Sequence, residues 1–294
     1  MQQLKDMGVI TKSYVLGLNI TDETISQFEC MGDFVNMENP NESKRIVSET
    51  MNKIFNSTTI RLDLLDIKNV PSETDVPVTF YDSESNRARY NFYHTIDPKG
   101  VPDTFSVDPT YNYNIQIHTT PPIQKKNISI TPFTYNVITE PAPQGELEVS
   151  VRGESFKLKI NCVVKKENTV IDVQNTSVSG KYLVGEYNLE ILTLPVITLN
   201  NIKVEQDKTT TIEIPAPGYI TFIKGAELYG GIYVNADNKW IEIYEYTQGN
   251  TKETLALQPG KYKTIYRYNG NKAMIFTKET DFEILTGTSI TQKL

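Results

Sequence analysis

The stretch "PAPGYITFIKG" (residues 215–225) decides the fold, because an earlier stretch, "PAPQGELEVSVRG" (residues 141–153), has the same form. A second motif, a turn followed by Tyr and an alternating strand, recurs at Tyr113, Tyr187 and Tyr262. Both motifs have a period of about 74 residues, and a fixed period of self-similarity indicates repeated structural units. The predicted repeats cover residues 67–140, 141–214 and 215–294.

Each repeat contains about six or seven short runs in which apolar and polar residues alternate. Gly, Pro, Asn and Asp separate these runs at intervals of about 8–12 residues, which is typical of β-sandwiches. An aromatic fraction of 10% agrees with strands, because aromatic side chains suit a pleated surface. The predicted fold class is therefore mainly β, with tandem β-sandwich modules preceded by a small α/β segment.

Composition excludes several classes of partner. A net charge of −7 argues against a nucleic-acid partner, which requires a basic face. No apolar run approaches the roughly 18 residues of a membrane span, so no membrane insertion is expected. The opening "MQQLKDMGVI" has no signal-peptide pattern, which indicates cytoplasm only if Met1 is the native start. Cys30 and Cys162 fall in different segments, so we expect no disulfide between them.

The first 60 residues follow a different pattern from the repeats. The runs "SYVLGLNI" and "DFVNM" predict short strands, and "TDETISQFECMG" between them predicts a helix that Thr21 can cap. A second helix is predicted from Asn39, with Pro40 at its first position and Glu42 in a capping box. The order strand, helix, strand, helix is typical of an α/β fold.

This segment, over about residues 8–57, resembles the C-terminal end of a von Willebrand factor type A (VWA) domain. In that family a late strand reading like "YVLGLN" leads into a helix, a tight turn returns the chain, and a final helix closes the domain. The resemblance implies that the chain carries only part of such a domain. A small α/β cap unrelated to that family is the alternative interpretation.

No metal or other cofactor is expected. The metal site of type A domains begins with an Asp-x-Ser-x-Ser loop, and a divalent metal would need that missing N-terminal part of the domain. The nearest string, "DSESN" at Asp82, has Glu84 where the motif needs Ser, and it lies between strand-like runs. We predict a hairpin turn there.

The repeated motif resembles the prealbumin-like or CnaB-like modules of bacterial surface proteins, with their "L-x-P-G-x-Y" strand. The stretch "LALQPGKYKTIYR", which contains Tyr262, fits this pattern best, and the stretch around Tyr113 departs furthest from it. The resemblance implies stalk or spacer modules, some of which bind carbohydrate, and an extracytoplasmic location in the periplasm or on the cell surface.

The sequence contains no recognisable catalytic set, so we expect no enzyme activity. His94 and His118 are the only histidines, and each lies in a strand-like run, where a histidine bonded to its neighbours is commoner than a metal ligand. Glu242 and Glu245 are predicted on opposite faces of one strand, which does not suit glycoside hydrolysis.

An aromatic face is predicted in the third repeat. In "KWIEIYEY", Ile241 and Ile243 alternate with a row that contains Trp240, Tyr244 and Tyr246. Tyr233 can lie across the hairpin from them. Such a row can stack on sugar rings or anchor a protein partner. Packing across strands, or against the second repeat, is the alternative that remains open.

Three functions are consistent with these features. The leading interpretation is a non-enzymatic bacterial extracytoplasmic protein of adhesion or assembly, a β-sandwich stalk attached to a VWA-type head. The alternative is an array of carbohydrate-binding modules with the aromatic platform in the third repeat. A third interpretation is an accessory part of a hydrolase whose catalytic domain lies upstream. The expected partner is a protein or a glycan.

Overall fold

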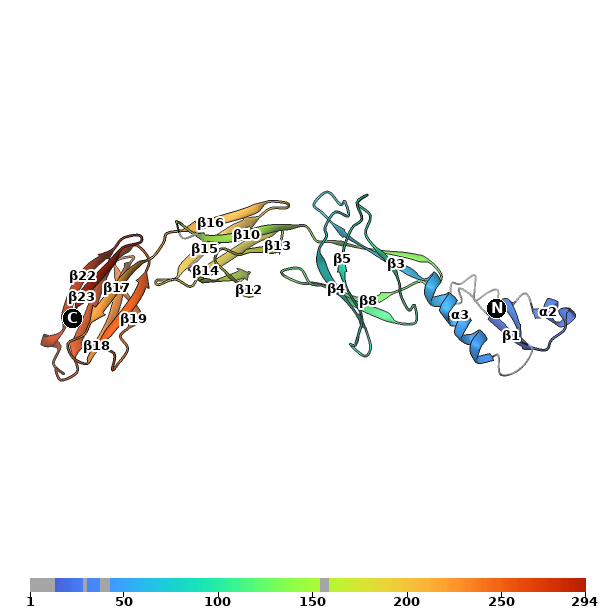
Figure 1. Ribbon diagram of the computed structural model, residues 1–294, viewed down its shortest axis with the longest axis horizontal. Coiled ribbons are helices and arrows are strands. Elements are labelled where there is room, and N and C mark those ends of the chain that lie inside the picture. The colour runs from blue at the N-terminus through green and yellow to red at the C-terminus, as the bar shows by residue number, and fades with distance from the viewer. Residues whose placement is uncertain (1–13, 29–30, 38–42, 154–158) are drawn as a thin grey trace. The chain divides into compact units, whose positions relative to one another are not determined.

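The computed structural model describes residues 14–28, 31–37, 43–153 and 159–294 (Figure 1). The chain is mainly β, as the sequence predicts, and it divides into two compact units, Met1–Pro143 and Gln144–Leu294. After the N-terminal segment, the strands pair in three separate sets, each with a three-stranded and a four-stranded sheet. We call these sets the first, second and third modules.

The first module has sheets in the order β6-β3-β9 and β5-β4-β7-β8. Its strands are β3 (Thr59–Leu65), β4 (Val76–Asp82), β5 (Ala88–His94), β6 (Thr104–Ser106), β7 (Asn112–Ile117), β8 (Ile123–Ser129) and β9 (Tyr135–Pro141). Because β3 pairs with β9 along its whole length, this module begins at Thr59. The predicted start of the first repeat at residue 67 is therefore too late by one strand, and the predicted α/β segment, residues 1–60, runs into that strand.

The other two modules repeat this topology, with sheets β13-β10-β16 and β12-β11-β14-β15, then β20-β17-β23 and β19-β18-β21-β22. The second module consists of β10 (Gln144–Val151), β11 (Asn161–Lys166), β12 (Thr169–Asn175), β13 (Ser179–Leu183), β14 (Gly185–Ile191), β15 (Ile197–Val204) and β16 (Thr209–Ile214). The third consists of β17 (Gly218–Ile223), β18 (Leu228–Ala236), β19 (Lys239–Glu245), β20 (Lys252–Leu257), β21 (Gly260–Tyr268), the 3-10 turn η3 (Met274–Phe276), β22 (Lys278–Ile284) and β23 (Ser289–Lys293).

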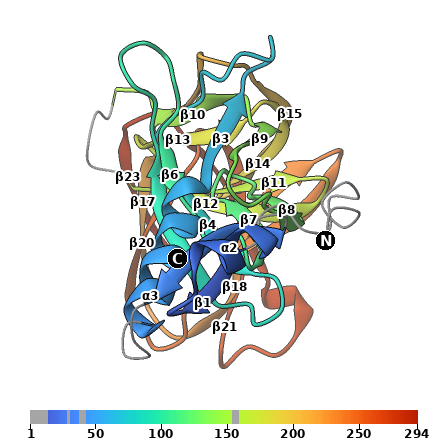
Figure 2. The same cartoon turned by 90° about the vertical axis from the view of Figure 1, so that its right-hand side faces the viewer.

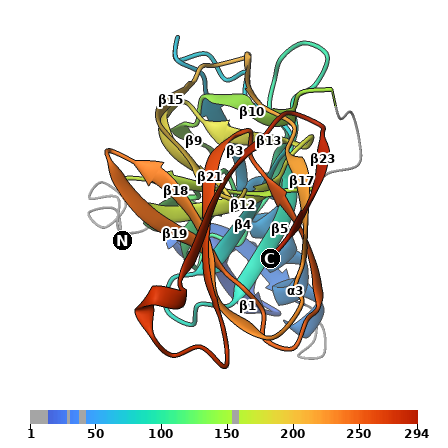
Figure 3. The same cartoon turned by 90° about the vertical axis from the view of Figure 1, so that its left-hand side faces the viewer.

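In each module the first and last strands are parallel neighbours in the three-stranded sheet. These pairs are β3 with β9, β10 with β16, and β17 with β23. Figure 3 shows β17 and β23 side by side. Because the two strands run in the same direction, the chain enters a module at one end and leaves it at the other.

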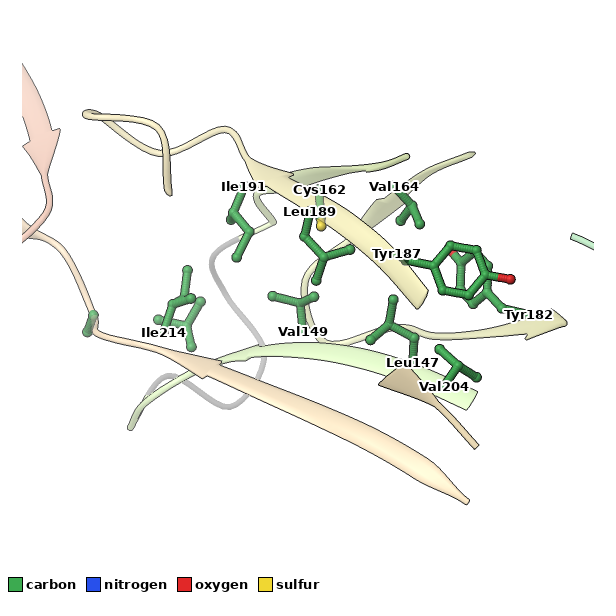
Figure 4. Packing of buried hydrophobic residues seen from close by; sticks show 12 residues of the cluster. Leu147, Val149, Cys162, Val164, Tyr182, Tyr187, Leu189, Ile191, Val204 and Ile214 are labelled. Carbon is green, nitrogen blue, oxygen red and sulfur yellow. The ribbon is translucent and has the colours of Figure 1, made fainter. Parts of the chain in front are cut away.

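The core of the second module lies between its two sheets (Figure 4). In β10 every second residue from Leu147 to Val151 is buried, which is the alternation expected of a strand with one face on a core. Burying one such aliphatic side chain stabilises the fold by about 1.5–3 kcal/mol. Cys162 belongs to this core as a free thiol, and burial raises its pKa to about 11. Cys30 lies outside the described residues.

Each module contains a buried tyrosine near the start of its fifth strand. Its hydroxyl donates to a backbone carbonyl four or five residues upstream, the geometry of a tyrosine corner. The bonds run from Tyr113 to Asp108 O, from Tyr187 to Leu183 O and from Tyr262 to Gln258 O, each at 2.6 Å. The tyrosine motif therefore recurs in the sequence because each module uses the same bond to hold its fourth and fifth strands together.

We expect the β-structure to unfold between about pH 10 and pH 12. Burial raises the pKa of Tyr187 and of Tyr262 from 10.0 to about 12. The stability that these two protonated phenols contribute is therefore fully present below pH 10 and is lost as the pH rises towards 12. Circular dichroism and phenolate absorbance, followed together, check this. The variant Tyr187→Phe/Tyr262→Phe should lose about 1 kcal/mol per bond at neutral pH and show a shallower alkaline loss. Ionisation of these phenols without loss of β-structure would contradict it.

In two of the modules, the residue that follows the corner tyrosine is an asparagine whose side chain accepts a hydrogen bond from the next strand. Asn114 Oδ1 accepts from Asn127 N at 2.9 Å, and Asn188 Oδ1 accepts from Asn201 N at 3.0 Å. Both acceptors sit at register shifts, and both donor residues have positive φ, 55° and 58°. In the third module Lys263 takes this place, and β21 pairs with β22 without a shift.

The N-terminal segment has the predicted order of strand, helix, strand, helix. Its elements are β1 (Tyr14–Leu18), α2 (Asp22–Phe28), β2 (Asp33–Met37) and α3 (Ser43–Ser57). β1 and β2 pair in parallel, and α2 connects them in the chain. Figure 2 labels β1, α2 and α3 of this segment. The predicted start of the second helix at Asn39, Pro40 and Glu42 lies outside the described residues. Among the helices that the structure describes, none is long and apolar enough to cross a bilayer.

Candidate functional site

The predicted aromatic face on β19 is divided between the surface and the core. Trp240 is 42% exposed, whereas Tyr246, just after the strand, is 2% exposed and hydrogen-bonded to Thr264 Oγ1 at 2.6 Å. Tyr244 packs against the core of the third module and donates to Glu253 Oε1 at 2.9 Å. The prediction that Trp240, Tyr244 and Tyr246 share one exposed face is therefore wrong.

A β-bulge in the pairing of β18 with β19 causes this division. Tyr233 pairs with Glu242, and the next pair is Ile232 with Tyr244, so Ile243 is the extra residue. An extra residue reverses the face to which later side chains point. Trp240 and Glu242, which precede the bulge, lie on the face of Tyr233, whereas Tyr244, which follows it, lies on the face of the buried Ile232.

The same bulge brings two carboxylates to one face, where opposite faces were predicted. Glu242 pairs with Tyr233 and Glu245 pairs with Gly231, two residues apart on β18. Burial raises the pKa of Tyr233, and the charge and hydrogen bond of Glu242 raise it further. This face therefore places the phenol of Tyr233 beside the carboxyl groups of Glu242 and Glu245.

Trp240 borders a shallow groove of about 430 Å³ on the third module. The groove is lined by Trp240, Lys261, Tyr262, Asp281, Phe282 and Glu283. The Nζ atom of Lys263 lies 4.8 Å from the centre of the indole ring and 2.9 Å from Glu279 Oε2. An exposed indole beside carboxylates and ammonium groups offers both a stacking surface and hydrogen-bonding groups.

A second groove, of about 570 Å³, lies between edge strands β5 and β6 of the first module. Four aromatic side chains line it, and the rings of Phe92 and Phe105 have their centres 4.6 Å apart. Tyr93 is 70% exposed at its edge. The aromatic run "RYNFYH" that ends at His94 was the sequence signal for this groove, but the sequence does not show that β5 and β6 lie at adjacent edges.

The two histidines, His94 at the end of β5 and His118 just after β7, have separate hydrogen-bond partners. His94 Nε2 donates to Leu62 O at 2.8 Å, and His118 Nε2 is hydrogen-bonded to Thr79 Oγ1 at 2.9 Å. Across the part of the chain that the structure describes, no group of three or more His, Cys, Asp or Glu side chains could hold a metal ion.

Asp82 closes the hairpin between β4 and β5, which confirms the predicted turn. Its carboxylate accepts from the Ser85 hydroxyl at 2.6 Å and from Arg89 at 2.9 Å, as well as from Glu84 N at 3.0 Å. The Ser85 hydroxyl and then Arg89 hold the pKa of Asp82 well below its usual range. These oxygens are occupied by the turn itself, so the string acts as a structural element.

A buried ion pair in the third module gave no signal in the sequence. Lys224 Nζ lies 3.1 Å from Glu253 Oε2 and donates to Thr247 O at 2.7 Å. Glu253 Oε1 also accepts from Tyr244 and from the backbone N–H of Thr247. The pair forms one polar network with the inward-facing end of β19, next to the core.

Comparison with solved structures finds β-rich proteins at low identity. The TIE protein of Bacillus anthracis is 15% identical, and the match covers 81% of this chain and 50% of that protein, with a TM-score of 0.22. This chain therefore spans about half the length of that protein. A Streptococcal ancillary pilin is 10% identical over 80% of this chain and 98% of its own, with a TM-score of 0.26. The minor pilin GBS52 of Streptococcus agalactiae is 11% identical. The match covers 81% of this chain and 94% of that protein, with a TM-score of 0.22.

TM-scores this low do not establish a shared arrangement of whole chains, so these likenesses carry no conclusion about function. No protein-family model matches the sequence. The comparison with curated proteins also gives no match.

Proposed function

We propose that this chain is a non-enzymatic β-sandwich protein of the bacterial cell exterior that acts in adhesion or assembly. The observation that carries the proposal is the use of one module three times in succession, with the same strand order and the same tyrosine corner. The repeated motif resembles modules that act as stalks and spacers in bacterial surface proteins, which supports this role. The proposed partner is a protein or a glycan, and no cofactor is needed.

The location tests this proposal first. An antibody against the third module should label intact source cells, and protease added outside the cells should remove the signal. Labelling that appears only after the cells are permeabilised would contradict the extracytoplasmic location.

A second candidate function is carbohydrate binding at the groove beside Trp240. The exposed indole can stack on a sugar ring, and the carboxylates of Asp281 and Glu283 can accept hydrogen bonds from its hydroxyl groups. Tyr233 lies on the same face as Trp240, whereas Tyr244 and Tyr246 face the core and would not contact a ligand there.

The variant Trp240→Ala is expected to weaken glycan binding about 2- to 12-fold, because a stacking contact of this kind contributes about 0.5–1.5 kcal/mol. Its melting temperature should fall little, since the contact with Lys263 is exposed. Glycan-array binding and differential scanning calorimetry check both effects. The control Tyr219→Ala removes a similarly exposed aromatic residue from the other sheet of the same module. No glycan binding by the wild type, or equal loss in both variants, would refute the lectin hypothesis.

We further propose that the N-terminal segment is the back end of a VWA domain that forms the head of the stalk. The strand–helix–strand–helix order and the parallel pairing of β1 with β2 support this. The intact mass of the native protein tests it. A mass that exceeds 33.4 kDa by that of a further domain, on the order of 150 residues, would support a head domain upstream. A native mass of 33.4 kDa would contradict it.

A further inference from the structure

The connection between β21 and β22, residues 269–277, presents three successive large apolar side chains to solvent. On the turn η3, Met274 is 83% exposed, Ile275 is 85% exposed and Phe276 is 50% exposed. Single exposed apolar residues are common on soluble proteins, but a contiguous apolar group indicates a contact surface. We call residues 274–276 the apolar tip.

The other two modules make the same connection with shorter segments, residues 118–122 and 192–196. In each of them a threonine hydroxyl closes the turn on a proline carbonyl. The bonds run from Thr119 to Pro121 O and from Thr193 to Pro195 O, at 2.7 and 2.6 Å. The third module therefore lengthens this connection and adds apolar residues that lie outside its own core cluster.

The apolar tip is held in place by its base. The guanidinium of Arg267 donates to Lys272 O at 2.9 Å and to Thr277 Oγ1 at 2.8 Å, so it bridges the two ends of the loop. Within the loop, Phe276 N donates to Ala273 O at 3.1 Å. A loop fixed in this way loses little conformational entropy when its tip makes a contact.

Cationic side chains flank the apolar tip, although the whole chain has a net charge of −7. Lys272 precedes it and Lys278 follows it, and Lys278 Nζ lies 4.8 Å from the ring centre of Tyr268. Of the acidic side chains near the loop, Glu279 forms an ion pair with Lys263, and Glu227 accepts a hydrogen bond from the neutral amide of Asn269. The loop therefore combines an apolar end with a basic and aromatic base.

We propose that the apolar tip inserts into the interfacial region of an anionic lipid bilayer. A tip that projects into solvent matches a fluid surface better than it matches a flat protein face. Its three apolar side chains would enter the acyl boundary while Lys272 and Lys278 meet the phosphate headgroups. The length criterion of about 18 apolar residues applies to segments that span a bilayer, and this contact reaches only the boundary of one leaflet.

Sedimentation of the full chain with lipid vesicles tests the proposal. We expect binding to vesicles of phosphatidylcholine with about one-third phosphatidylglycerol, weaker binding to pure phosphatidylcholine, and loss of the difference at high salt. The variant Met274→Ser/Ile275→Ser/Phe276→Ser should bind at least about 10-fold less. The variant Lys272→Gln/Lys278→Gln should bind the anionic vesicles a few-fold less tightly than the wild type does. Its binding to pure phosphatidylcholine vesicles should be unchanged.

A control replaces three apolar residues elsewhere that are each 52–58% exposed, Val170→Ser/Val173→Ser/Leu285→Ser, and should bind like the wild type. Insertion itself is read from Phe276→Trp in a Trp240→Phe background, whose emission should shift to the blue on vesicle addition. Unchanged binding by the serine variant, or no binding by the wild type, overturns the proposal. Self-association that the serine variant abolishes, without vesicle binding, would assign the apolar tip to a second copy of this chain instead.

Discussion

The variant Lys224→Met is expected to lower the free energy of unfolding of the third module by about 3–5 kcal/mol, because it leaves a buried carboxylate without its cation. The side chains of Lys224 and Glu253 are 3% and 7% exposed. In the second module the corresponding inward position holds Val151, which is part of an apolar core. The module fold therefore does not require this ion pair, since the second module forms without one at this position. When the pair is broken, the loss of stability comes from the buried charge that remains.

A double-mutant cycle separates charge from packing. Glu253→Gln alone should be destabilising, since its amide opposes the ammonium of Lys224. The double variant Lys224→Met/Glu253→Gln should recover at least half of the loss, because a glutamine oxygen can still accept from Thr247 N and Tyr244. Trp240 is the only tryptophan, so its fluorescence during urea unfolding reports on the third module within the full chain. A double variant no more stable than Lys224→Met would show that packing, and not charge, causes the loss.

The same cycle has a pH signature. Burial alone would raise the pKa of Glu253, but bonds from Thr247, Lys224 and Tyr244 outweigh it and lower the pKa. A lowered folded-state pKa gives stability that is present at neutral pH and lost as the pH falls through that pKa. The double variant, which has no carboxyl group at position 253, should not show this loss of stability as the pH falls.

The variant Gly230→Ala is expected to destabilise the third module by on the order of 4 kcal/mol, enough to unfold it at moderate urea. Gly230 lies in β18 with φ +132°, a conformation that other residues rarely adopt. A Cβ there would lie 2.0 Å from Ile265 O and 2.6 Å from the Cα of Tyr266. Both neighbours are backbone atoms of the central strand β21, so neither can move aside.

Gly249→Ala is the matched control for this variant. Gly249 also has positive φ, +79°, but a Cβ there would meet no atom within 4 Å. It should therefore cost only the conformational strain, about 1 kcal/mol. Trp240 fluorescence reports both unfolding transitions. Equal losses in the two variants would show that backbone conformation alone, and not contact with β21, makes Gly230 necessary.

The repeats and the β-class were predictable because they depend on local patterns. Each tyrosine corner joins residues only four or five positions apart, so Tyr187 and its counterparts recur with their turn signals in the sequence. The first strand of the first module was missed, since "TIRLDLL" follows α3 directly and its partner β9 is distant in sequence. A parallel pairing of this kind leaves no turn signal between the two strands.

The aromatic site was predicted less well, for a specific physical reason. Apolar and other residues alternate without interruption around Trp240, and a strict alternation of side chains would place Tyr244 and Tyr246 on the same strand face as Trp240. The bulge at Ile243 reverses that order, and it is set by the pairing with β18 rather than by β19 itself. Lys224 was missed because a charged residue in an alternating run usually faces solvent, and only its contact with Glu253 makes burial acceptable.

The parallel pairing of first and last strands determines how a module responds to tension. A pull applied through the two chain ends of a module draws its first strand and its last strand in opposite directions along their length. The hydrogen bonds between β3 and β9, which run from Thr59 to Leu65 against Tyr135 to Pro141, are then loaded together in shear. An antiparallel terminal pair would instead open one bond at a time from its end. The terminal strand pair of each module therefore resists a pull along the chain through several hydrogen bonds at once.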